Sequence, residues 1–478
     1  MVNKIVFLFV LCAFSAYSAV NFPYPQEKNY GNGTINTTVA NASANLKTKF
    51  TSFFSTHYEE NQNKTMGRIK YDDTQQTVSE GIGYGMIMMV YFSDNEKSYQ
   101  AEFDRLWKYY NNFLDSRGLM HWQINGFTGV AGQNAATDAE FDVAFALEMA
   151  YYQFGGQKYL DDAAALIGKI KQHEMENDGL HKPGDGWGAN ITRRNPSYVS
   201  PAAFELFKRV DDSFWTTALA KNYTLLKTNQ NQSTGLPSNW CNNNGNPEDN
   251  NFGYDASRAP WRWAWSYAWF GHQDAKDLLD KLAAWVSTKA PADIKGSINI
   301  TNGNMGSDNN STFIGPLLNS MQVDSKYQTN INTYWAELIK KNESSYFNKA
   351  VQILYGLFAT GNMPNLKALA EAQSSSSSEP SSSSEEEPSS SSSSEDETPI
   401  VLPQIVHSNA LNSVNNGVNL QVVRDASLKV FDLKGNMVRS LKFTRGSYIV
   451  SLADLPKGLY IVKVQFGNQK EILRVPIR

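Results

Sequence analysis

Apolar residues recur at helical spacing over the first three quarters of the chain. Between 98 and 113 the apolar side chains stand three or four positions apart, and the same period returns at 141–154 and 275–287. This spacing places them on one face of an amphipathic α-helix. Segments rich in Gly, Asn and Pro, such as 242–253, separate the periodic stretches. The pattern predicts a large all-α domain over residues 22–368.

The pattern changes twice after that domain. Residues 371–399 are almost wholly Ser, Glu and Pro, and their charges are all acidic. Such a segment cannot bury enough apolar surface to offset its chain entropy, so it predicts a flexible linker. From 400 to 478, apolar and polar residues alternate in short runs, including 427–433, 448–450 and 458–464. A period of two between turn residues predicts a small antiparallel β-sandwich.

Residues 1–19 have the features of a secretory signal peptide. Lys4 supplies the positive start, residues 5–14 are apolar, and Ala16-Tyr17-Ser18 offers a cleavage site between small residues. The apolar run is too short for a stable membrane span. A lipoprotein site at Cys12 is the weaker alternative, because a large Leu precedes that cysteine. After cleavage Cys241 is the one cysteine left, and we expect no internal disulfide.

Composition and charge narrow the class of function. The chain has 478 residues and a net charge of −4, which does not favour binding to nucleic acid. Its 6 His show no metal-ligand spacing, so we expect no metal and no cofactor. Aromatic residues make up 12% of the chain, which suits a large core or a groove that stacks on sugar rings. Trp261, Trp265 and Trp269 recur at helical spacing, and we interpret this stripe as core rather than as a sugar platform.

Three acidic residues stand where helices are expected to begin. Glu80 lies in the segment 79–85, whose three glycines are costly in a helix and indicate the close approach of another backbone or a ligand. Asp138 opens an apolar helix. Asp255 is followed three residues later by Arg258, which can hold that carboxylate ionised. Helix capping is the alternative interpretation for all three.

Together with further motifs, these residues resemble glycoside hydrolase family 8. The resemblance runs from 23 to 365 and implies an (α/α)6 barrel that hydrolyses β-1,4-glucans or related polymers with inversion. One departure is Glu140, where the family more usually has Asp. The motifs that carry the resemblance are Ser79-Glu80-Gly81-Ile82-Gly83-Tyr84-Gly85, Gly118-Leu119-Met120-His121-Trp122, Ala136-Thr137-Asp138-Ala139, Lys182-Pro183-Gly184-Asp185-Gly186-Trp187-Gly188, Asn195-Pro196-Ser197-Tyr198, Tyr254-Asp255-Ala256-Ser257-Arg258, Ser311-Thr312-Phe313-Ile314-Gly315-Pro316 and Thr360-Gly361-Asn362.

The resemblance also implies a role for each matched residue. Glu80 would be the general acid, Asp255 the general base that activates water, and Asp138 a ligand of the sugar at the cleavage point. The residues that would contact the substrate or position the water and the base are Trp122, Trp187, Tyr198, Arg258 and Tyr254.

A general acid must hold its proton near neutral pH, so the pKa of Glu80 must be raised. A helix N-terminus acts in the opposite direction. An ionised Asp138 nearby and an apolar wall of Tyr84 and Met86 would raise it. We therefore expect a net increase in the pKa of Glu80.

Residues 400–478, the tail of the chain, resemble the C-terminal sorting domain of bacterial type IX secretion. The segments that carry this resemblance are 428–435 and 455–462. The implied partner is the secretion machinery. A carbohydrate-binding module is the alternative, which the absence of Trp from residues 400–478 disfavours.

The overall expectation is a secreted, monomeric endo-β-1,4-glucanase acting on cellulose, carboxymethylcellulose or mixed-linkage β-glucan. Xylan and chitosan are alternative substrates for the same chemistry. Two other classes compete with this interpretation: a glucan-binding protein that has lost catalysis, and a polysaccharide lyase on a similar helical fold.

Overall fold

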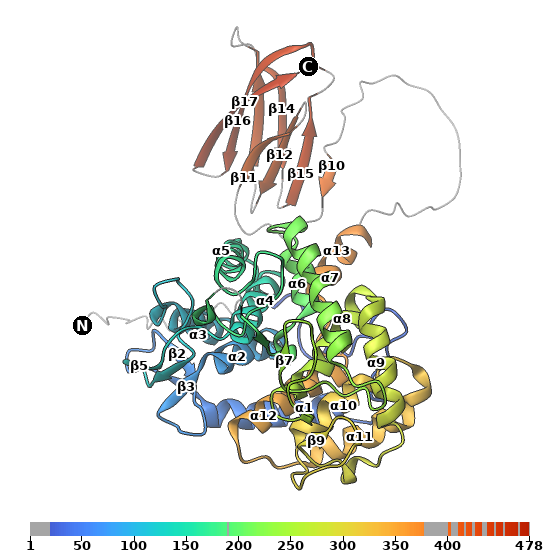
Figure 1. The fold of residues 1–478 in the computed structure, drawn as a ribbon. Coiled ribbons are helices and arrows are strands. Elements are labelled where there is room, and N and C mark those ends of the chain that lie inside the picture. Colours follow the sequence, from blue (N-terminus) through green and yellow to red (C-terminus); the bar gives the residue numbers. More distant parts are fainter. Residues whose placement is uncertain are drawn as a thin grey trace, which may run out of the picture. The chain divides into compact units, whose positions relative to one another are not determined.

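The computed structural model describes two compact units, with a boundary between Asn365 and Leu366 (Figure 1). The predicted signal peptide at 1–19 lies outside the described residues, as do residues 377–399 of the predicted linker. The described residues are 20–188, 191–376, 400–402, 410–414, 417–422, 426–432, 437–443, 446–452, 455–466 and 469–477.

Six helices of the first unit contact one another in a cycle. Each contacts the next in chain order, and the last contacts the first. They are buried on nearly all sides; in the first of them every residue except Glu80 is buried. The six are α2 (Ser79–Phe92), α4 (Thr137–Phe154), α6 (Pro201–Phe207), α8 (Ala259–Phe270), α10 (Ser311–Met321) and α12 (Tyr346–Ala359).

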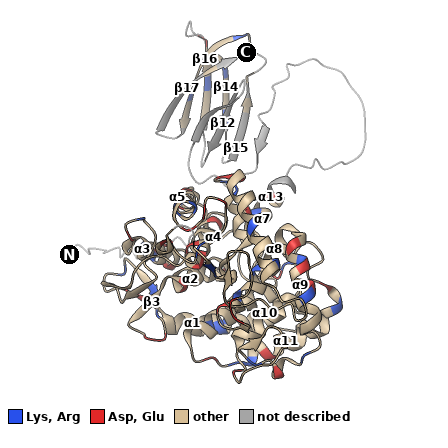
Figure 2. Ribbon diagram, viewed as in Figure 1, with Lys and Arg blue, Asp and Glu red and all other residues tan. Residues whose placement is uncertain are grey.

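A second helix contacts each member of this cycle. These partners are amphipathic: α9 buries Leu278, Leu279 and Leu282 and carries Asp and Lys on its other side (Figure 2). The pairs are α1 (Ala42–His57) with α12, α3 (Gln100–Asn112) with α2, α5 (Lys158–His173) with α4, α7 (Asp212–Asn229) with α6, α9 (Gln273–Val286) with α8, and α11 (Gln328–Lys340) with α10. The prediction of a helix-rich domain is confirmed, and its periodic segments coincide with α3, α4 and α9.

Short strands and turns connect these helices. The sequence shows few strand signals here, because strands of two to four residues are too short to show a period. The antiparallel strands are β1 (Tyr58–Glu60) with β2 (Gly67–Ile69), β3 (Gln76–Val78) with β4 (Gln123–Asn125) and β5 (Gly129–Gly132), β6 (Arg193–Arg194) with β7 (Cys241–Asn242), and β8 (Asn251–Phe252) with β9 (Ile298–Asn299). The 3-10 turns are η1 (Asp185–Trp187), η2 (Pro196–Tyr198), η3 (Ala256–Arg258), η4 (Pro291–Asp293) and η5 (Ser325–Tyr327).

The second unit contains α13 (Leu366–Ser376) and two antiparallel sheets, and α13 includes the first residues of the predicted linker. Val450 of one sheet shares a core with Leu428, Val430 and Val462 of the other. The predicted strands are confirmed, although the strands before 426 and the strand at 437–443 were not predicted. The strand order of one sheet is β10 (Ile400–Leu402), β15 (Gly446–Ser451), β12 (Gly417–Val422), β11 (Ala410–Val414). The strand order of the other sheet is β14 (Met437–Phe443), β13 (Ala426–Phe431), β16 (Gly458–Phe466), β17 (Gln469–Ile477).

No helix in the described part of the chain combines the length and apolar character that crossing a bilayer requires.

Candidate active site

Glu80 lies in the first turn of α2, where its carboxylate faces two donors. Arg258 Nη1 donates to Oε2 at 2.8 Å, and the Tyr346 hydroxyl donates to Oε1 at 3.2 Å. The N-cap of α2 is Val78, with no side-chain cap, so the capping alternative is not observed. Burial raises the pKa of Glu80 to about 7; the Arg258 charge opposes this rise and the negative charge of Asp138 adds to it. The expected increase is confirmed.

Asp138 occupies the matching position on the neighbouring helix α4 and is buried. Its carboxylate accepts a hydrogen bond from the same Arg258 Nη1 rather than capping its own helix. Burial raises the pKa of Asp138 and the Arg258 charge opposes that rise. One turn further along α4, Asp142 accepts two hydrogen bonds from Arg262, at 2.7 and 2.8 Å. Two successive acid–arginine pairs therefore join α4 to the start of α8.

Asp255 is the most accessible of the three acids. Its side chain is 41% exposed, against 19% for Glu80 and 5% for Asp138. It stands at the N-cap of η3 without capping that turn. Asn195 Nδ2 donates to Oδ1 at 3.0 Å and Trp240 Nε1 donates to Oδ2 at 3.3 Å. Asp255 is thus a solvent-accessible carboxylate held by two neutral donors.

Arg258 connects the three acids. Its buried guanidinium contacts Glu80 and Asp138 through Nη1, and Nη2 lies 3.6 Å from Asp255 Oδ1. The guanidinium carbon lies 5.2 Å from the centre of the Tyr198 ring. Burial raises the pKa of Tyr198 well above its usual range, and the charge of Asp138 adds to that rise. Tyr198 therefore keeps its hydroxyl proton beside the carboxylates.

Three aromatic side chains are exposed, namely Trp122, Trp187 and Tyr254, and no other aromatic side chain in the described part of residues 20–376 is. The backbone carbonyl of Trp122 accepts a hydrogen bond from the backbone N–H of Ser79 at 2.9 Å, so the backbone of Trp122 lies next to the residue that precedes Glu80. Trp187 stacks on Trp240, with ring centres 6.1 Å apart. Exposed flat rings next to carboxylates form a surface suited to sugar rings.

Trp261 and Trp265 of the tryptophan stripe lie in the core, as expected, whereas Trp269 is only partly buried. Trp261, Trp263 and Trp265 of α8 are fully buried. The indole of Trp269 donates a hydrogen bond to the carbonyl of Met363 at 3.1 Å. These side chains therefore contribute packing rather than a sugar platform.

The glycines after Glu80 mark close approaches between elements, as the sequence predicted. A Cβ on Gly83 would lie 3.0 Å from the Cβ of Asp142 and 3.3 Å from the carbonyl oxygen of Ala139, both on α4. A Cβ on Gly81 would lie 2.9 Å from the Tyr346 hydroxyl. Glycine thus lets α4 and Tyr346 approach the helix that carries the acid.

Three residues that contact the acids had no role predicted from the sequence, namely Asn195, Trp240 and Tyr346. Asn195 had a readable signal, because an Asn directly before Pro196 is typical of a capping turn. Its side chain does accept the backbone hydrogen bond of Ser197. Trp240 and Tyr346 carry no comparable local pattern, since their partners lie 15 and 266 positions away in the sequence.

Behind Asp138 lie two fully buried glutamates, Glu140 and Glu174. The Tyr110 hydroxyl donates a hydrogen bond to Oε1 of Glu140 at 3.1 Å. Oε2 of Glu140 and both carboxyl oxygens of Glu174 have no hydrogen-bond partner. Burial raises the pKa of both glutamates well above the usual range, and the charge of Glu174 further raises that of Glu140. Each side chain is therefore most stable in the folded protein when it is protonated.

The raised pKa of Glu140 predicts a loss of stability at alkaline pH. The unfolded chain releases this proton above about pH 4.5, whereas the folded protein retains it, so folding becomes less favourable as pH rises. Glu140→Gln keeps an acceptor for Tyr110 and removes the ionisable proton. We expect the variant to melt at least about 2 °C higher than the wild type at pH 8, with little difference at pH 4. Equal melting curves at pH 8 would contradict the assignment.

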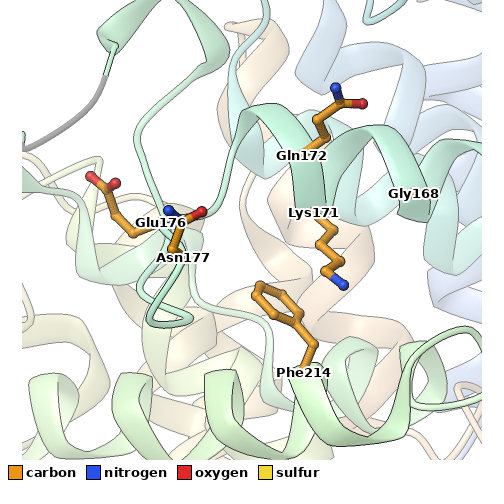
Figure 3. A pocket seen from close by; sticks show the side chains of 6 residues that line it. All are labelled: Gly168, Lys171, Gln172, Glu176, Asn177 and Phe214. Atoms are coloured by element: carbon orange, nitrogen blue, oxygen red, sulfur yellow. The ribbon is translucent and has the colours of Figure 1, made fainter.

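A pocket of about 440 Å³ lies between α5 and α7 (Figure 3), and none of Glu80, Asp138 and Asp255 lines it. Lys171 points towards Phe214 there, with its ammonium 4.8 Å from the ring centre. Glu176 is the one carboxylate among its lining residues. Because glycoside hydrolysis needs two carboxyl groups, this pocket does not provide a second catalytic site.

Within the described residues, no group of three or more His, Cys, Asp or Glu is arranged to hold a metal ion. The absence of a metal and of a cofactor stays a prediction.

Comparison with known proteins finds a family match in each of the two units. Residues 22–361 match the family model of glycosyl hydrolases family 8, and residues 412–478 match a secretion system C-terminal sorting domain. Endoglucanase 2 of Ruminiclostridium josui is 31% identical over 75% of this chain and 80% of its own length. A reducing end xylose-releasing exo-oligoxylanase of Halalkalibacterium halodurans is 23% identical over 59% of this chain and 79% of its own length. The apo structure of a β-1,3-1,4-glucanase from Paenibacillus sp. X4 superposes with a TM-score of 0.68 at 25% identity, covering 72% of this chain and 99% of that one.

Proposed function

The chain belongs to glycosyl hydrolases family 8, and from this membership we propose that it is an exported endo-β-1,4-glucanase that cleaves its substrate by a single inverting displacement. One observation carries the proposal: a mostly buried glutamate with a raised pKa, Glu80, shares Arg258 with an exposed aspartate, Asp255. An inverting glycosidase needs this pairing of a protonated acid with an accessible base. The cyclic helix contacts support an (α/α)6 barrel as the scaffold.

In the proposed mechanism Glu80 donates its proton to the glycosidic oxygen as the bond breaks. Asp255 takes a proton from a water molecule that attacks the opposite face of the sugar. Its exposure supports this role, because the water must reach it. Tyr198, protonated beside the acids, positions that water together with Arg258.

The remaining site residues bind the sugar chain. Asp138 accepts sugar hydroxyls at the cleavage point and favours a distorted ring. The exposed rings of Trp122, Trp187 and Tyr254 stack on sugars along the chain. The relatives support β-glucan as substrate, since one is an endoglucanase and another a β-1,3-1,4-glucanase. The exo-oligoxylanase relative supports xylan as the second candidate.

The sorting domain supports export to the cell surface or the medium through type IX secretion. The proposed precursor carries a signal peptide at 1–19, a catalytic domain at 22–368, a linker at 371–399 and a sorting domain at 400–478.

Substrate and stereochemistry can be tested in one experiment. We expect the purified protein to shorten carboxymethylcellulose and lichenan faster than xylan or chitosan. Proton NMR of the first products should show the α-anomer before mutarotation, because a single displacement inverts the β-linkage. If the β-anomer appears first, Asp255 is not the base and Asp138 becomes the leading nucleophile. Faster cleavage of xylan than of either glucan would favour xylan, the second candidate, as the substrate.

The pKa of Glu80 predicts the alkaline limit of activity. The general acid must be protonated in the free enzyme, so kcat/KM should fall as pH rises through about 7. Beyond that point the loss should approach about tenfold per pH unit, because only the protonated fraction of the enzyme reacts. Initial rates on a soluble glucan between pH 5 and 9 measure this limb. A flat profile up to pH 9 would show that another group supplies the proton.

A further inference from the structure

We propose that Asn195 and Trp240 are positioning residues that clamp the general base Asp255, an inference that rests on the proposed function. Asn195 Nδ2 donates to one carboxylate oxygen at 3.0 Å, and Trp240 Nε1 donates to the other at 3.3 Å. A carboxylate held at both oxygens by separate donors has its plane fixed. The fixed plane keeps one direction for accepting the proton of the attacking water.

Asp255 needs such support because its own helical turn does not provide it. Its side chain makes no capping hydrogen bond to η3, and it is 41% exposed. The nearest Arg258 nitrogen lies 3.6 Å from Oδ1, beyond the usual hydrogen-bond distance. Without the two neutral donors, the exposed carboxylate would rotate between orientations.

The two donors occupy opposite positions at the end of one short ribbon. Strands β6 and β7 pair antiparallel, with Arg194 opposite Cys241. Asn195 directly follows β6 and Trp240 directly precedes β7, so the next step of this register places the two donors opposite each other. The ribbon thus sets the spacing of two groups that are distant in the sequence.

Each donor is itself held in one orientation. Ser197 donates to Asn195 Oδ1 from its backbone at 3.0 Å and from its hydroxyl at 2.8 Å, so the amide presents Nδ2 to Asp255. Trp240 has only a donor to offer, since an indole nitrogen cannot accept. Its ring stacks with Trp187, and the guanidinium of Arg193 lies over it, 4.3 Å from the ring centre. Both donors are uncharged, so they orient the carboxylate without adding charge.

The first test replaces the indole by a ring that lacks the donor. Trp240→Phe keeps an aromatic ring beside Trp187 and removes the N–H group. We expect kcat to fall roughly 10- to 100-fold, because a hydrogen bond to a charged group is lost, while KM changes by less than about twofold. Trp285→Phe, on the outer helix α9, is the matched control and should leave both constants unchanged. A Trp240→Phe enzyme with normal kcat, or with a change confined to KM, would overturn the proposal.

A double-mutant cycle separates positioning from a general structural role. In the full-length chain carrying Asp255→Ala, adding Trp240→Phe should cost no further activity, because the group that Trp240 positions is absent. A cost equal to that in the wild type would show that Trp240 acts on the fold or the sugar, and the clamp would be rejected. If Asp255→Ala alone keeps wild-type activity, the base assignment fails instead, and that result is distinct.

Asn195→Asp provides an independent variant of the same shape. It keeps the acceptor for Ser197 but turns the donating atom into a carboxylate oxygen facing Asp255. We expect a loss of kcat of at least about tenfold in the wild type and none in the Asp255→Ala background. This cycle decides the proposal even if Trp240→Phe does not fold. Equal losses in both backgrounds would reject it.

Discussion

Glu80→Gln is expected to abolish hydrolysis while the fold and the affinity for glucan remain. Glutamine keeps the size of the side chain, and its single carbonyl oxygen can still accept the hydrogen bond of Arg258 while its amide NH2 donates to the Tyr346 hydroxyl. Only the transferable proton is lost. General acid catalysis contributes roughly 10²- to 10⁴-fold, and a sugar leaving group places the loss at the upper end. Initial rates on carboxymethylcellulose measure the effect.

A matched control for this variant is Glu337→Gln on α11. Glu337 is also ion-paired, with Lys340 and Lys341, but it lies outside the acid cluster. The control should keep wild-type kcat and KM. If Glu80→Gln retains a tenth of the activity with an unchanged melting curve, Glu80 is not the acid.

Arg258→Lys is expected to reduce kcat at least about 100-fold. Arg258 contacts Glu80 and Asp138 and faces Asp255 through a planar fork that a single ammonium group cannot reproduce. Displacing a reacting group by about 1 Å can cost this much activity. Because the Arg258 charge lowers the pKa of Glu80, weakening their contact should also move the alkaline limb of kcat/KM to higher pH. Initial rates between pH 5 and 9 test both effects.

Arg262→Lys is the control for Arg258→Lys. Arg262 is equally buried and makes two hydrogen bonds to Asp142, one turn further along both helices. This variant should melt at a lower temperature than the wild type but keep the alkaline limb in place. Should both variants lose activity without any shift of that limb, Arg258 would be structural rather than part of the acid–base system.

The helices were readable from the sequence to different degrees. The outer helices α3 and α9 pack one face against the domain, so their apolar residues show the helical period. α2 is buried on all sides apart from Glu80, which removes the contrast between faces, and its glycines argue against a helix on propensity. Those glycines still predicted a close approach, and α4 and Tyr346 account for it.

The sequence by itself determined the chemistry available to this protein. The helical period, the alternation of the tail and the motifs around Glu80, Asp138 and Asp255 follow from local residue order. Local order also showed that Arg258 stands near Asp255, because they are three positions apart.

Only the tertiary structure decided how these groups act on one another. The contact of Arg258 with Glu80 and Asp138 depends on how α2, α4 and α8 pack. The clamp of Asn195 and Trp240 depends on the register of a ribbon whose strands lie far apart in the chain. The pKa of Glu80 depends above all on burial, which is a property of everything packed around a side chain. Spacing along the chain encodes short-range geometry, whereas desolvation and long-range contacts exist only once the helices have assembled.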